Sequence, residues 1–91
     1  EWLDRVLHQD LKLFPNPTRS SLNLEFNGAW SDQGEFEIMF TDLTGRVFEQ
    51  KTAEGEGIHR FDFSELPAGV YFIQIITESG NTLVERFEKL N

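Results

Sequence analysis

Three residues in the second half of the chain carry the side chains of a hydrolytic triad. His59, Asp62 and Ser64 lie within six residues of one another, and a histidine held by a carboxylate can activate a serine hydroxyl for acyl transfer. The surrounding residues alternate between polar and apolar, which predicts a strand, and the side chains of a strand point to alternate faces. The three groups therefore cannot converge on one substrate, and we expect a protein that is not an enzyme.

Two other sets of residues have the types that bind metal ions. His8 and His59 are far apart in the sequence, and neither has a second histidine at a ligand spacing. Glu54, Glu56 and Asp62 could offer oxygen to calcium, but such an ion needs about six oxygen ligands from one shaped loop. The acidic loop here lacks that spacing. We expect no metal and no other cofactor.

Tryptophan offers a further possibility, the stacking of a sugar ring. Trp30 lies in a loop between two predicted strands, and Trp2 is near the start of the chain. An amphipathic aromatic ring beside a loop can equally cover the open end of a β-sandwich. Both interpretations of Trp30 stay open at this point.

The bulk composition excludes several classes of partner. The net charge is -8, and the eight Lys and Arg residues are scattered, so a nucleic acid or an anionic membrane surface is not an expected partner. No apolar run approaches the ~20 residues of a membrane-spanning helix, so we expect no direct membrane insertion. Cysteine is absent, which excludes disulfides. The sequence begins without Met, and we expect it to be part of a longer protein.

The most hydrophobic stretch runs from Leu66 to Ile76 and is interrupted only by Gln74. Pro67 and Gly69 favour a turn at its start. The β-branched and aromatic residues that follow are typical of a strand. Because the run is apolar on both faces, we expect it at the centre of a sheet and covered on each side.

Alternating apolar residues bounded by turn residues predict six further strands. A charged last strand is expected at a sheet margin, and Asp42-Leu43-Thr44-Gly45 predicts a hairpin turn. The fold class is therefore all-β, a seven-stranded antiparallel immunoglobulin-like β-sandwich. The six strands are Leu11–Phe14, Ser21–Phe26, Glu35–Thr41, Arg46–Lys51, Ile58–Phe63 and Thr82–Leu90.

The first ten residues carry the weakest signal. Trp2, Leu3, Val6 and Leu7 fall at helical spacing, which allows a short amphipathic turn. A linker remnant is the alternative that the length of the segment favours. We therefore divide the chain into a linker remnant at residues 1–10 and one domain at residues 11–91.

Four sequence elements occur together in an order that resembles a known family. They are Phe14-Pro15-Asn16-Pro17, Asp42-Leu43-Thr44-Gly45-Arg46-Val47, Leu66-Pro67-Ala68-Gly69-Val70-Tyr71-Phe72-Ile73, and the terminal Arg86-Phe87-Glu88-Lys89-Leu90. With these elements, residues 11–91 resemble the type A C-terminal sorting domain of the type IX secretion system, found on exported proteins of Bacteroidetes.

The resemblance implies a function that no side-chain chemistry announces. The domain would direct its cargo protein across the outer membrane, with translocon proteins of the type IX system and a sortase-like cysteine peptidase as partners. The cargo would pass through the periplasm and end on the cell surface or be released. A structural or carbohydrate-binding module of an extracellular protein, of immunoglobulin or fibronectin type, is the alternative.

The resemblance also implies which residues the translocon recognises. Arg46, Arg86 and Lys89 are the expected contacts, because a solvent-facing cation has little structural reason to be there. The last strand could offer its backbone edge or its charged face to a receptor. The motif residues Gly45, Pro67, Gly69 and Tyr71 belong to the same set, with turn and core roles as the alternative.

Overall fold

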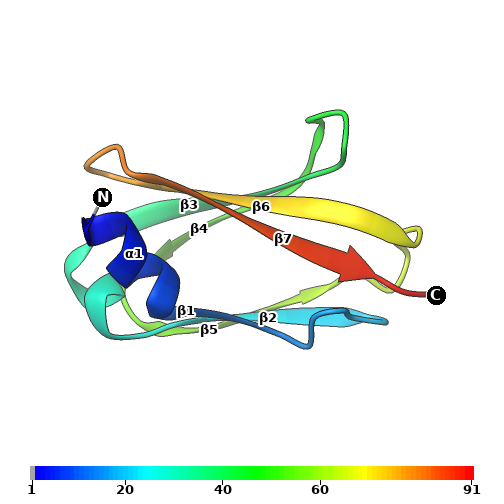
Figure 1. Cartoon of the computed structure of the whole chain (residues 1–91), viewed down its shortest axis with the longest axis horizontal. Helices are drawn as coiled ribbons and strands as arrows, with labels where there is room; N and C mark the ends of the chain where they lie inside the picture. The colour runs from blue at the N-terminus through cyan, green and yellow to red at the C-terminus, as the bar shows by residue number, and fades with distance from the viewer. Residues whose placement is uncertain (1) are drawn as a thin grey trace.

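Two antiparallel sheets packed face to face make up the body of the protein, and a short helix lies at one end (Figure 1). This computed structural model describes residues 2–91, with side chains from residue 5 onward. The elements are the helix α1 (Trp2–Gln9), the strands β1 (Leu11–Phe14) and β2 (Ser21–Phe26), the 3-10 helix η1 (Gly28–Asp32), and the strands β3 (Glu35–Thr41), β4 (Val47–Glu54), β5 (Gly57–Asp62), β6 (Gly69–Thr77) and β7 (Thr82–Lys89).

The strands divide three and four between the sheets. One sheet has the order β1-β2-β5 and the other the order β4-β3-β6-β7. All five strand pairings are antiparallel. The predicted all-β sandwich is confirmed, as are the β3–β4 hairpin and the place of β7 at a sheet margin. β6 and β7 form a second hairpin.

The predicted central strand is central, but it is not covered on both sides. β6 lies between β3 and β7, and its residues alternate between buried and half-buried. Ile73 and Ile75 are fully buried between the sheets, whereas Phe72 and Ile76 point to the outer face and are half-buried. The expectation of two covered faces was wrong because this sandwich has only two layers, so each sheet packs against one partner.

Aromatic rings fill the space between the sheets at both ends. Phe40 of β3 contacts the ring of Phe61 at 4.6 Å and that of Phe63 at 5.0 Å between centroids, both edge to face. At the other end the Trp30 ring packs edge to face on Phe26 at 4.9 Å. Such pairs add to the burial of apolar area, and they hold the two layers in register.

Residues 2–9 form a helix rather than an irregular tail. α1 ends beside β1, and the side chain of its Leu7 is fully buried in the common core. The helical alternative is therefore the observed one. The division of the parent protein at residue 10 stays a prediction, because the contacts of Leu7 concern only this chain.

Candidate recognition surface

The turn between β3 and β4 is built as its residue types predict. The Asp42 carboxylate accepts hydrogen bonds from the Thr44 hydroxyl at 2.6 Å, the Thr44 amide at 2.9 Å and the Arg46 amide at 3.1 Å. The Thr44 hydroxyl is the main cause that lowers the pKa of Asp42, and the two backbone amides and the Arg46 charge act in the same direction. Gly45 closes the turn with a φ of 88°, a value that side chains disfavour.

This tight turn presents the side chains of Leu43 and Arg46 to solvent. Leu43 is 71% exposed, and the Arg46 side chain is 81% exposed although its Nε lies 3.4 Å from the Asp42 carboxylate. An exposed ion pair of this kind contributes little stability. The guanidinium of Arg46 is thus presented to solvent, as predicted.

The second motif forms the entry to β6. The Tyr71 hydroxyl donates a hydrogen bond of 2.6 Å to the carbonyl of Pro67, and its ring is buried against Phe87. A tyrosine that binds the backbone a few residues upstream is a corner device of immunoglobulin-like sandwiches. Pro67 and Tyr71 therefore have structural tasks, and Gly69 follows them as the first residue of β6.

The two motifs lie side by side in space. A hollow of about 250 Å³ separates the turn residues Asp42, Leu43 and Thr44 from the segment 68–71. Both segments lie at the end of the sandwich where the chain terminates (Figure 1). Six of the seven predicted site residues are thus brought to one end of the molecule: Gly45, Arg46, Pro67, Gly69, Tyr71 and Lys89, which pairs with Gly69.

A row of outward-facing residues connects this end to β7. Val47 pairs with Thr41, Thr41 with Phe72, and Phe72 with Arg86. Val47 is 45% exposed, Phe72 is half-buried and Arg86 is exposed. We call these four residues the outer row. Arg86 lies at one end of this row, and the exposed Arg46 directly precedes Val47 in the chain at the other end.

Lys89 does not join this surface, and its prediction as a solvent-facing cation was wrong. It lies opposite Gly69 in the β6–β7 pairing, is 4% exposed, and its Nζ donates to the Leu90 carbonyl at 2.9 Å. Side chains alternate along β7, and Lys89 shares the inward face with Leu83 and Phe87. A lysine stem packs on apolar groups while its ammonium group reaches the margin.

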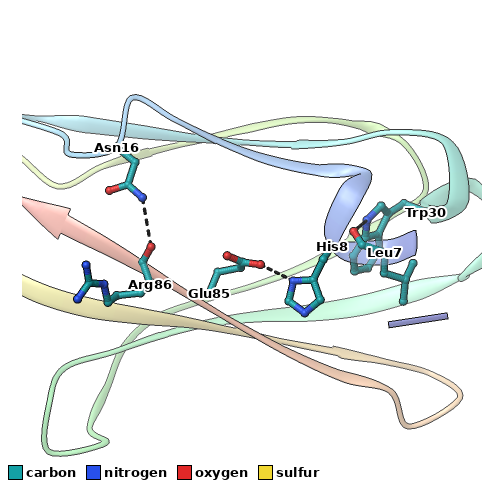
Figure 2. A network of polar contacts seen from close by, with 6 residues as sticks. All are labelled: Leu7, His8, Asn16, Trp30, Glu85 and Arg86. Carbon is teal, nitrogen blue, oxygen red and sulfur yellow. Dashed lines mark hydrogen bonds and ion pairs between the residues drawn. The ribbon is translucent and has the colours of Figure 1, made fainter. Parts of the chain in front are cut away.

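The free edge of β7 is partly occupied, which the sequence did not reveal. The Asn16 side chain donates from Nδ2 to the Arg86 carbonyl at 3.2 Å (Figure 2). Its Oδ1 accepts from the Glu88 amide at 3.1 Å. Thr18 continues this pairing, since its amide donates to the Glu88 carbonyl and its carbonyl accepts from Leu90. A receptor strand cannot bind these backbone groups as long as the contacts persist, so the charged face of β7 is the part that remains accessible.

The signal for this contact was an amide residue between two prolines. Pro15 and Pro17 have no amide hydrogen to donate to a sheet edge, so the side chain of Asn16 performs the pairing in place of the backbone. Both prolines lie beside the edge of β7, a position that suits a residue without an amide hydrogen. The partner strand, 70 residues further along the chain, was beyond sequence reasoning.

The residues first considered for chemistry have other contacts. The Asp62 carboxylate accepts a hydrogen bond from the Ser64 amide at 3.0 Å, which is the first cause of its lowered pKa. The His59 ring lies edge-on to Phe26, and its pKa is lowered by burial and, to a smaller extent, by the Lys51 charge. The described residues contain no group of three or more His, Cys, Asp or Glu that could hold a metal ion.

Trp30 is a cover and not a platform for sugars. It is fully buried, and its Nε1 donates to the Leu7 carbonyl at 3.0 Å. A ring without an exposed face cannot stack on a ligand, so Trp30 does not support the carbohydrate-binding alternative. Trp2, the second tryptophan, has a side chain outside the described part of the chain. None of the helices described is long and apolar enough to cross a bilayer.

Comparison with known proteins agrees with this architecture. A crystal structure of a DUF3244 family protein from Bacteroides vulgatus, described as an immunoglobulin-like β-sandwich, superposes with a TM-score of 0.72 at 19% identity. The similarity covers 89% of this chain and 85% of that one. No curated protein matches the sequence. Residues 12–88 match the family model described as a secretion system C-terminal sorting domain. The chain belongs to this family, the C-terminal sorting domains of the type IX secretion system.

Proposed function

We propose that the domain acts as a folded address with no reaction of its own, read through the outer row and the turn at Arg46. As a type IX sorting signal it interacts with the type IX machinery and marks a protein for the cell surface or the exterior. Our proposal adds the contact surface, passage of the cargo through the periplasm, and later removal of the domain by a sortase-like cysteine peptidase. The observation that carries it is the convergence of the two motifs at one exposed end.

The chemistry of this surface specifies its partner. Phe72 and Val47 provide an apolar strip, with Arg86 at one end and the exposed Arg46 next to Val47 in the chain at the other end. These cations stand out on a domain with a net charge of -8. The receptor should therefore offer an apolar patch flanked by carboxylates, because arginine pairs well with carboxylates and complementary charge fixes orientation.

A secretion assay tests the address. Residues 1–91 are fused behind an inert periplasmic reporter in a host with a working type IX system. The reporter should reach the cell surface, and this delivery should disappear in a translocon mutant. Delivery that persists without the translocon would contradict the proposal.

Charge reversal tests the contact surface separately. The double variant Arg46→Glu with Arg86→Glu should leave the reporter in the periplasm while the unfolding midpoint of the isolated domain stays close to that of the wild type. Arg60→Glu is the matched control, because Arg60 is an exposed arginine on β5 in the other sheet. Normal delivery of the double variant would assign recognition to another face.

A further inference from the structure

The last residues of α1 are joined to the sandwich by contacts from three parts of the fold. Leu7 is fully buried in the core. Its carbonyl accepts the buried hydrogen bond of 3.0 Å from Trp30 Nε1, and the neighbouring His8 contacts the Glu85 carboxylate of β7 (Figure 2). The helix is therefore attached to both η1 and β7, at the opposite end of the sandwich from the β3–β4 turn (Figure 1).

Asp10, the residue that follows the helix, is also hydrogen-bonded to the rest of the fold. The Asp10 amide donates to the Val6 carbonyl at 3.0 Å, and the Asp10 carbonyl accepts from the Asn27 amide at 2.8 Å. Its carboxylate accepts from the Ala29 amide, also at 2.8 Å. Gly28 allows this close approach, since a Cβ at that position would lie 2.5 Å from Asp10 Oδ2 and its φ is +50°.

These contacts bear on where a peptidase can act. A peptidase binds its substrate as an extended strand through main-chain hydrogen bonds. The bonds from Leu7 to Asp10 lie in a docked helix and its end, where the main chain already has partners. Such bonds are cut only in the small fraction of molecules in which the segment has opened. Upstream of Val6 the described contacts with η1 and β7 end, and the main chain is held only by the hydrogen bonds of α1 itself.

We propose that residues 7–10 belong to the folded sorting domain and that the processing bond lies on the N-terminal side of Leu7. This inference depends on the proposed removal of the domain. Hydrolysis there breaks one amide C–N bond and takes up one water molecule. It leaves a carboxylate on the cargo and an amino group on a sorting domain that keeps its Leu7–Trp30 contact.

Limited proteolysis of the whole 91-residue chain tests this without any secretion machinery. Thermolysin cuts before aliphatic residues, so fragments beginning at Leu3 or Val6 should precede any fragment beginning at Leu11, as followed by intact mass. Leu7→Ala should release the fragment 11–91 on the order of tenfold faster or more, because burial of Leu7 holds the segment closed. Arg5→Ala is the matched control, an exposed position on the same helix, and should change nothing.

A milder variant guards against a simple loss of fold. Glu85→Gln keeps the side-chain volume but removes the charge that faces His8, and it should speed release of the fragment 11–91 about two- to fivefold. The circular dichroism spectrum should stay that of the wild type. Wild-type cleavage at Leu11 as early as at Leu3 or Val6 would overturn the proposal, and so would identical rates in Leu7→Ala.

Processing in cells separates this inference from the sorting function. The reporter fusion is recovered from a type IX-competent host, and the new N-terminus of the released domain is sequenced. An N-terminus at or before Leu7 supports the inference, whereas one between His8 and Leu11 overturns it. Either result leaves the sorting function standing as long as the reporter reaches the surface, and failure of delivery would count against the sorting function alone.

Discussion

Single polar side chains complete backbone pairing at several places in this domain. Asp42 satisfies the amides of its own turn, and Asn16 supplies a donor and an acceptor to β7 as a neighbouring strand would. The role of Asp42 was predictable because its partners lie within four residues. The role of Asn16 was not, because its partners are about 70 residues away and only the fold brings them together.

Asn16→Ala should loosen the edge of β7 without unfolding the domain. It removes two hydrogen bonds at an exposed site, so we expect a loss of about 1 kcal/mol in the free energy of unfolding. The Glu88 amide should exchange its hydrogen faster, as followed by NMR. Asn23→Ala is the control, since Asn23 donates one exposed hydrogen bond to Phe14 on β1. Unchanged exchange at Glu88 would contradict the bond between its amide and Asn16.

The carboxylates of Asp42 and Asp62 should titrate below the usual value of 3.8. Their pKa values are lowered in the fold by hydrogen bonds to Thr44 and Ser64, respectively. A lowered pKa means that the stabilising contribution is present at neutral pH and is lost as the pH falls through the titration below 3.8. Carbon-detected NMR titration measures both midpoints. Thr44→Val should raise the midpoint of Asp42 and leave that of Asp62 in place.

At the level of strands, the sequence was informative about type and order but not about layers. Five of the seven strand positions could be placed from alternating apolar residues and turn residues to within about two residues at each end. The hydrophobic run in β6 was taken as doubly covered, although only the face of Ile73 and Ile75 is buried. Whether a second layer covers an apolar face depends on the number of sheets, which the pattern within one strand does not specify. The prediction that Lys89 faces solvent failed for the same reason. Side chains alternate along β7, and Lys89 shares the inner face with Phe87.

The same change from Ile to Val, made once on each face of β6, tests whether only one face of the strand is buried. Ile73→Val removes a methylene group from a fully buried side chain and should cost about 0.5–1.5 kcal/mol of unfolding free energy. Ile76→Val removes the same group from the half-buried outer face and should cost less than half as much. Urea unfolding of the two variants measures the difference. Equal losses would mean that the outer face is covered in solution, as the hydrophobic run first suggested.

The two ends of the molecule are built differently. At one end the turn at Arg46 and the start of β6 form an exposed, hollowed surface. At the other end α1 closes the sandwich over Trp30. The family match begins at residue 12, so α1 lies outside it. The motifs at the first end were found in the sequence because they resemble the family, whereas the helix has no counterpart in those motifs and only its packing shows that it belongs to the fold.

Deletion of residues 1–9 should therefore uncover Trp30 and leave the sandwich folded. The deletion removes the buried Leu7 side chain and leaves the Trp30 Nε1 without its carbonyl partner, which together should cost about 2–4 kcal/mol of unfolding free energy. Trp30 is then the only tryptophan, and its fluorescence should shift to the red as water reaches the ring. The full chain with Trp2→Phe is the control, because its emission also comes from Trp30 alone but with α1 in place. If the two proteins emit alike and unfold at the same urea concentration, α1 contributes nothing to this end of the sandwich. A red shift with a lower midpoint would establish the helix as the cover that the Leu7–Trp30 contact indicates.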